Sequence, residues 1–139
     1  MTKIKTTNGI STHFDKPNDH KQIAREFLEQ VVAVNIDDAY SKYVSSKGKH
    51  HNPFFREGFP ALQVAMKEDH HQFPNKQFSI KTLIGEGDLV AVHSHLVIRP
   101  NEPGMTVVHL FRFQGEKIVE LWDVGQAIPA DSPNHDGAF

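Results

Sequence analysis

Three runs of sequence decide the fold: LVAVHSHLVIR at 89–99, MTVVHLFRF at 105–113 and IVELWDVGQ at 118–126. Each run is rich in β-branched and aromatic residues, and short segments with Gly, Pro, Asn or Asp separate them. A further run at 78–84 alternates apolar and polar residues, as a half-buried strand does. The second half of the chain therefore predicts a meander of antiparallel strands.

The first half of the chain predicts helices instead. Apolar residues recur at helical spacing over 18–35, over 37–44 and from Pro60 to about 69, whereas 45–58 shows no regular pattern and is expected to be irregular. The stripe of the first helix consists of Ile23, Phe27, Val31 and Val34. Three helices followed by a meander predict an α+β fold with the helices packed on one face of the sheet.

Length, charge and composition narrow the possible functions. The chain has 139 residues, a formal net charge of −2 and no cysteine. We expect a flexible N-terminal arm at 1–17, a single domain at 18–139 and no nucleic-acid partner, because no basic excess is available to neutralise phosphates. Disulfides, thiolate catalysis and cysteine-ligated zinc are excluded. No apolar run is long enough to span a membrane and the start lacks a secretory signal, so a cytoplasmic protein is expected.

Both faces of the run at 89–99 are apolar. One face carries Val90 and Val92, and the other carries Ala91 and Val97 together with two histidines. A sheet that is apolar on both faces needs cover on both, and the helices can supply only one. We therefore expect a homodimer in which a second copy covers the outer face of the sheet.

Histidine is unusually frequent, with ten residues. His93 and His95 are two apart on a strand, so both side chains leave the same face. A five-residue connection at 100–104 would then place His109 opposite His95 and Phe111 opposite His93. Three imidazoles would share one patch beneath the helices and could line a pocket, or else be half-buried spacers bonded to backbone or water. Apart from His51, the other six histidines are expected to have no specific role: His13, His20, His50, His70, His71 and His135.

Asp123 is an acid inside an otherwise apolar strand. A buried carboxylate must be hydrogen-bonded, paired, or raised in pKa until it is protonated, and a pKa near neutrality suits a general acid or base. A two-residue turn at 115–116 would send Asp123 to the face opposite His109. A longer loop, or one β-bulge in either strand, would bring the two together. The sequence leaves both alternatives open.

Five stretches in combination resemble the SnoaL-like polyketide cyclases: 51–53 (His-Asn-Pro), 87–95, 108–113, 116–124, and the tail formed by 126–129, Asn134 and 137–139. The resemblance covers roughly residues 44–139. It implies the nuclear-transport-factor-2-like fold, a cone of three helices wrapped on a strongly curved antiparallel sheet around a deep pocket.

The resemblance also implies an activity. In these cyclases a carboxylate of the last strand is the acid and base for an intramolecular aldol ring closure, without metal or organic cofactor, and it corresponds to Asp123. His109 corresponds to a pocket histidine and His51 to the histidine of the His-Asn-Pro motif. If this carries over, the strands must contain the β-bulge, and a small apolar or carbonyl compound is the expected partner. The further expected substrate-binding residues are His93, His95, Phe111 and Trp122.

Three alternative hypotheses compete with an aldol cyclase. A metal-dependent enzyme would use the three histidines with a carboxylate, and Gly87, His93 and His95 match the opening of a cupin metal motif, although Glu102 follows too late. A binding protein of the same fold would use the pocket without catalysis. Epoxide hydrolysis would need two carboxylates bridged by an arginine; Arg112 lies in a suitable strand, but no second buried acid is evident.

Overall fold

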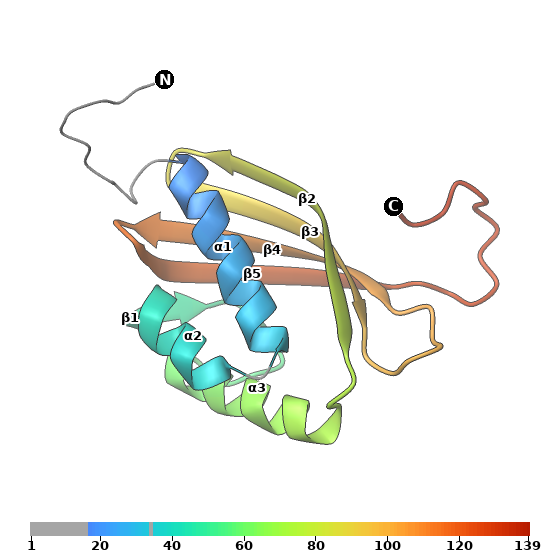
Figure 1. Cartoon of the computed structure of the whole chain (residues 1–139), viewed down its shortest axis with the longest axis horizontal. Coiled ribbons are helices and arrows are strands. Elements are labelled where there is room, and N and C mark those ends of the chain that lie inside the picture. The colour runs from blue at the N-terminus through green and yellow to red at the C-terminus, as the bar shows by residue number, and fades with distance from the viewer. Residues whose placement is uncertain (1–16, 34) are drawn as a thin grey trace.

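The computed structural model describes residues 17–33 and 35–139. The N-terminal arm up to residue 16, His13 and Val34 lie outside these residues, so the expectations for them stay predictions. The elements, in chain order, are α1 (Pro17–Val32), α2 (Ile36–Tyr43), β1 (Val44–His50), α3 (Phe59–Gln72), β2 (Gln77–Glu86), β3 (Leu89–Val97), β4 (Met105–Gln114) and β5 (Lys117–Ala127) (Figure 1). Three helices precede a four-strand meander, which confirms the predicted α+β class.

The sheet has five strands in the order β1-β5-β4-β3-β2. All neighbours are antiparallel except β1, which runs parallel to β5. The expectation that 45–58 is irregular is wrong for its first part, because pairing with β5, rather than any apolar alternation, holds this polar stretch as a strand. At Gly48 a β-carbon would lie 2.5 Å from the carbonyl oxygen of Val119 and 2.6 Å from the ring of Phe59, so only glycine fits there.

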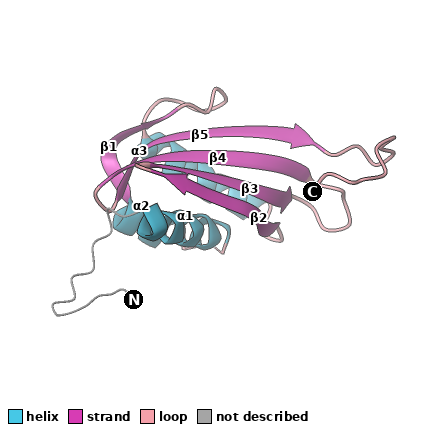
Figure 2. Ribbon diagram, turned by 90° about the horizontal axis from the view of Figure 1, so that it is seen from above, coloured by secondary structure: helices cyan, strands magenta, loops and turns pink. Residues whose placement is uncertain are grey.

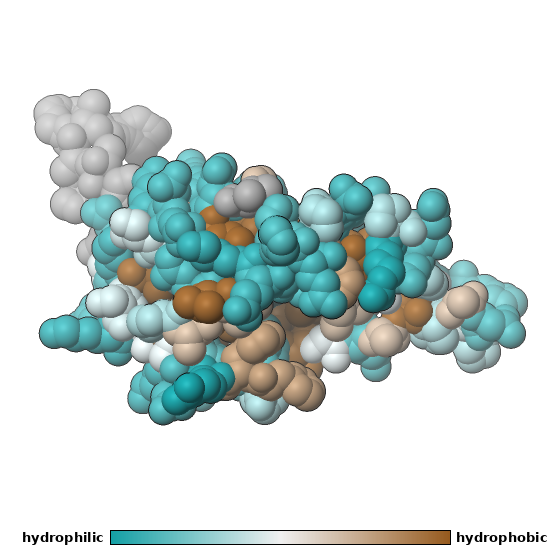
Figure 3. All heavy atoms as spheres, turned by 90° about the horizontal axis from the view of Figure 1, so that it is seen from below, coloured by the Kyte–Doolittle hydropathy of each residue, from teal (hydrophilic) through white to brown (hydrophobic). Residues whose placement is uncertain are grey.

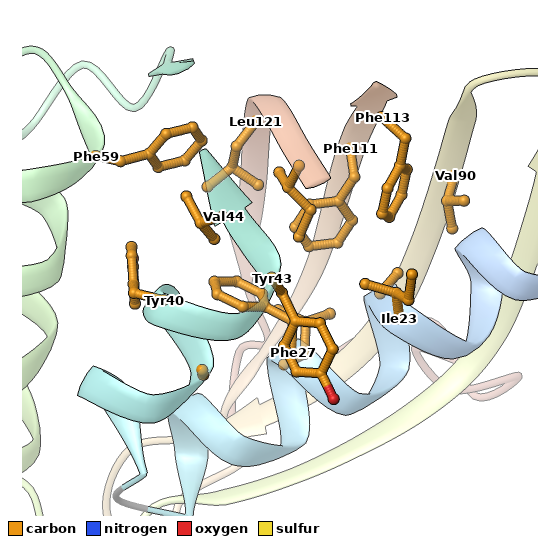
Figure 4. Packing of buried hydrophobic residues seen from close by; sticks show 14 of the residues in the cluster. Ile23, Phe27, Tyr40, Tyr43, Val44, Phe59, Val90, Phe111, Phe113 and Leu121 are labelled. Atoms are coloured by element: carbon orange, nitrogen blue, oxygen red, sulfur yellow. The ribbon is translucent and has the colours of Figure 1, made fainter. Parts of the chain in front are cut away.

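The core lies between the helices and one face of the sheet. Figure 2 shows α1 and α2 as a layer against the concave side of the curved strands. Figure 4 shows aromatic rings packed there. The rings of Phe27 on α1 and Phe111 on β4 lie edge to face with their centres 5.9 Å apart, and those of Tyr40 and Phe59, both on helices, are 6.4 Å apart. The expected stripe of α1 is confirmed at Ile23 and Phe27, which are both buried.

The opposite face of the sheet is less completely covered. Ile84, Ala91, Leu110 and Trp122 pair in succession across four strands and form an apolar row there. Ile84 is 61% exposed and Leu110 38% exposed. The homodimer expected to cover this face stays a prediction.

Hydrophobic side chains also reach the surface elsewhere. Figure 3 views the molecule from below and shows hydrophobic side chains between hydrophilic groups near the centre of this view. Among the residues that the structure describes, Phe54 is the most exposed large hydrophobic residue, at 88%. Within the described ranges, no helix is long and apolar enough to cross a membrane.

Candidate functional site

A β-bulge sets which face each residue of β5 occupies. Beyond the tight turn that joins β4 to β5, Phe113 pairs with Ile118. The next pair is Arg112 with Glu120, which leaves Val119 as an extra residue in β5. An extra residue in one strand moves every later side chain of that strand to the other face. The bulge that the family resemblance required is therefore confirmed.

His109 and Asp123 are direct cross-strand partners because of this bulge. Both lie on the face that carries the buried residues Phe111 and Leu121, which is the face packed against the helices. Directly opposite residues of an antiparallel pair have β-carbons about 4.5–5.5 Å apart. The imidazole and the carboxylate thus lie side by side on the inner face of the sheet.

Asn52 holds one oxygen of this carboxylate. Its Nδ2 donates a hydrogen bond of 3.0 Å to Oδ2 of Asp123. Its Oδ1 accepts the backbone N–H of Phe54 at 2.9 Å, which fixes the orientation of the amide. Of the three ways to accommodate a buried carboxylate, the structure thus shows hydrogen bonding. The family resemblance implies a role for His51 of the His-Asn-Pro motif, whereas in the structure Asn52 is the residue of that motif that contacts Asp123.

His50 holds the loop that presents Asn52. Its Nε2 lies 2.7 Å from the carbonyl oxygen of Arg56, and its Nδ1 accepts the backbone N–H of Asn52 at 3.2 Å. Both contacts are satisfied by a neutral ring protonated on Nε2. The expectation that His50 has no specific role is wrong, because this buried ring fixes the loop after β1.

Three buried polar atoms on the inner face have no hydrogen-bond partner among the described residues. They are Oδ1 of Asp123, Nδ1 of His109 and Oγ of Ser94, and a fourth such atom, Nδ1 of His70, lies on α3. Leaving a buried polar group unpaired costs about 1–3 kcal/mol. Three such atoms on adjacent strands make this part of the inner face a candidate ligand site.

Burial sets the protonation states around Asp123. It lowers the pKa of His109 to about 4, and the opposing attraction of the Asp123 carboxylate is smaller, so the imidazole is neutral at pH 7. Burial, helped by the charge of Asp123, raises the pKa of Tyr40 above its usual value near 10, so this hydroxyl keeps its proton. The site therefore combines a hydrogen-bonded carboxyl group with two neutral groups that can donate.

The lowered pKa of His109 predicts a pH-dependent stability. The unfolded chain binds this proton near pH 6.5 and the folded chain only near pH 4, so the free energy of unfolding falls as the pH drops through this window. The slope from this group reaches at most about 1.4 kcal/mol per pH unit. We expect the urea midpoint of the His109→Gln variant to fall less steeply between pH 7 and pH 4 than that of the wild type. An equally steep loss in the variant would contradict the assignment.

A cavity of about 730 Å³ opens beside this site rather than over it. It lies between α2, β1, α3 and the start of β5, and its walls include Tyr40, Phe59, Gln63 and Lys117 but neither His109 nor Asp123. Tyr40 relates the two places, because its pKa responds to the charge of Asp123.

The predicted register between β3 and β4 is wrong. His93 pairs with Val108 and His95 with Thr106, whereas His109 pairs with Val92. The connection is longer than expected, because β3 ends at residue 97 and the first pair after the loop joins residues 96 and 105. This change of parity places His93 and His95 on the outer face, so the three imidazoles do not form one patch.

The C-terminal tail covers the two outer histidines. The ring of Phe139 lies 5.3 Å from that of His93 and 4.9 Å from that of His95. Nε2 of His95 is also 2.8 Å from the carbonyl oxygen of Pro103. These two imidazoles thus contact the tail and the loop after β3, not the carboxylate of Asp123.

His51 and Trp122 also lie on the outer face, because Trp122 precedes Asp123 directly in the strand. Their rings are stacked with centres 5.0 Å apart, and Nε2 of His51 is 2.6 Å from Oε2 of Glu120. That hydrogen bond holds the pKa of Glu120 below its usual value. The structure does not bring His51 and Trp122 together with His109.

Arg112 bridges two carboxylates on that outer face. It contacts Glu120 through Nε at 3.4 Å and Asp88 through Nη1 at 3.1 Å. This is the pairing that the epoxide-hydrolysis alternative requires, but the Asp88 side chain is 52% exposed and the cluster lies across the sheet from Asp123. Among residues 17–33 and 35–139, no three His, Cys, Asp or Glu side chains are grouped so that they could hold a metal ion.

His20 is a further correction, since it was expected to have no specific role. Its ring is buried and stacked on Phe113 with centres 4.4 Å apart. Nε2 lies 3.0 Å from the carbonyl oxygen of Gly115, and Nδ1 lies 3.4 Å from that of Gly87. His20 therefore ties α1 to the two turns at one end of the sheet.

Comparison with known proteins agrees with this geometry. Three solved structures share the fold at low sequence identity. A SnoaL-like protein of unknown function from Burkholderia thailandensis has a TM-score of 0.68 at 16% identity, over 81% of this chain and 98% of that one. A nuclear-transport-factor-2-like protein of unknown function from Cytophaga hutchinsonii has 0.63 at 15%, over 80% and 90%. A proposed ketosteroid isomerase from Kribbella flavida has 0.67 at 12%, over 86% and 87%.

Sequence comparison gives the family itself. No curated protein matches the chain. The family model described as SnoaL-like polyketide cyclase matches residues 22–130, which include Asn52, His109 and Asp123. With the nuclear-transport-factor-2-like fold in place, this match shows that the chain belongs to the SnoaL-like polyketide cyclase family.

Proposed function

We propose that the protein catalyses acid–base chemistry on a small carbonyl compound, with Asp123 as the group that accepts and returns the proton. One observation carries the proposal: Oδ2 of Asp123 is held by Asn52, while the buried Oδ1 and the neighbouring Nδ1 of His109 have no partner among residues 17–33 and 35–139. A fixed carboxylate with one oxygen free, beside a neutral donor, suits removal of a proton next to a carbonyl.

The proposed reaction begins with enolisation. Oδ1 of Asp123 takes the proton from the carbon next to the carbonyl, and the C–H electron pair moves into an enolate. The neutral imidazole of His109 donates an N–H to the enolate oxygen, as an oxyanion stabiliser does. The enolate carbon then attacks a second carbonyl of the same molecule, forming the C–C bond. The resulting alkoxide recovers the proton from Asp123, so no net oxidation or reduction occurs.

The family and fold support this choice over the alternatives. Family membership is shared with polyketide cyclases, and the fold is shared with a proposed ketosteroid isomerase. His93 and His95, which a metal-dependent site would need, lie on the other face from His109. A binding protein without catalysis remains the rival, and it differs in one measurable property, because it would bind ketones without labilising their α-protons.

Proton exchange on a simple ketone tests the proposal. We expect the protein to accelerate deuterium uptake at the carbon next to the carbonyl of 1-tetralone in D₂O, followed by ¹H NMR. A positioned acid–base group typically contributes about 10²–10⁴ in rate. Binding of 1-tetralone without exchange above the buffer rate would assign the chain to the rival class.

A further inference from the structure

Ser94 is a polar residue at a position that packing alone would make apolar. It lies on the inner face of β3, in line with Val90 and Val92, and is completely buried. In the sheet it pairs with Ile80 on one side and Val107 on the other. Its hydroxyl has no hydrogen-bond partner among the described residues.

The place of Ser94 relates it to the proposed catalytic pair. Val92, His109 and Asp123 form one row across β3, β4 and β5, and Ser94 begins the next row on the same face. Ser94 and His109 are thus diagonal neighbours, whose separation is about 7–8 Å. From β3 to β5 the span is two strand spacings, about 9–10 Å.

The row of Ser94 ends at an exposed glycine that a flexible side chain covers. Its member on β5 is Gly125, which is exposed and carries no side chain. The methyl group of Met105 occupies the position that a β-carbon of Gly125 would take. Methionine is flexible and fills irregular gaps, so its side chain can move aside. An opening over Gly125 would lead along this row past Val107 toward Ser94.

We propose that the Ser94 hydroxyl binds a second oxygen of the ligand while Asp123 and His109 engage the carbonyl, so that the protein selects flat ketones of about two rings that carry a hydroxyl or carbonyl at the far end. This inference rests on the proposed function, since it takes the reacting carbonyl to lie at Asp123. Three unpartnered atoms, at Ser94, His109 and Asp123, then receive partners from one molecule.

A matched pair of ketones tests the inference. The probes are 1-tetralone and 6-hydroxy-1-tetralone, which differ only in the distal hydroxyl. We expect the wild-type chain to bind the hydroxylated ketone more tightly than 1-tetralone. Ser94→Ala should reduce this ratio of affinities by about threefold to tenfold, which is the usual effect of one neutral hydrogen bond. Affinity for 1-tetralone should stay the same in the variant. Isothermal titration calorimetry measures both.

The control is Ser79→Ala, which removes an exposed serine hydroxyl from the outer face of the adjacent strand and should change neither affinity. Thermal unfolding without ligand distinguishes a ligand-binding role of Ser94 from a structural one. If the hydroxyl only binds ligand, removing it does not lower the melting temperature, because it has no partner among the residues that the structure describes. The inference is overturned if Ser94→Ala melts clearly lower, if it keeps the full preference, or if wild type shows none, including no binding of either ketone. Failure of the exchange assay with this preference intact would instead count against the proposed catalysis.

Discussion

Asp123→Asn is expected to lower the rate of α-proton exchange by about 10²–10⁴, down to the rate in buffer alone. An amide keeps the size of the carboxyl group and can still lie beside Asn52. It has no basic oxygen that could take a proton, so the chemical step is lost while ketone binding is retained. Exchange followed by ¹H NMR, together with calorimetric titration of 1-tetralone, separates these two effects.

Glu120→Gln is the matched control for this experiment. Glu120 lies three residues earlier on the same strand, but on the outer face with His51 and Arg112. The Glu120→Gln variant should leave the exchange rate unchanged, although it removes the same charge as Asp123→Asn. If the Glu120 variant lost activity and the Asp123 variant did not, the proposed site would lie on the wrong face of the sheet.

Phe111→Ala is expected to cost about 3–5 kcal/mol of the free energy of unfolding. Phe111 is one of the expected substrate-binding residues, but its side chain is fully buried, edge to face with Phe27 and 6.5 Å from the ring centre of Phe113. Truncation therefore leaves a cavity in the core. Urea unfolding at pH 7 measures the loss, and a change below 1 kcal/mol would contradict this placement.

Phe54→Ala provides the comparison for that measurement. The same side chain is removed, but from a position that is 88% exposed, so the expected change stays within about 0.5 kcal/mol. The contrast between the two variants isolates burial as the cause.

The elements of the fold that could be predicted are those with a strong local pattern. The stripe of α1 and the apolar alternation of β2 to β5 are visible in the sequence because hydrophobic periodicity reports burial directly. The strand β1 could not be found this way, since VSSKGKH has no apolar alternation and forms a strand only through pairing with β5.

The candidate site could also be predicted only in part, and here the register of the strands set the limit. The side-chain period of a strand is two, so a single residue decides the face. The bulge at Val119 followed from the family resemblance and brought Asp123 to His109, whereas the length of the β3–β4 connection was misjudged and moved His93 and His95 away. Asn52 and His20 act through contacts with residues distant in the chain, and no local pattern reveals these.

We propose that ketones bind on the inner face, between Asp123, His109 and the helices. Intermolecular nuclear Overhauser effects between 1-tetralone and the imidazole protons of the assigned histidines locate the bound ketone. We expect contacts from the ligand to His109 and none to His93 or His95, which lie across the sheet. Contacts to His93 and His95 without any to His109 would contradict it.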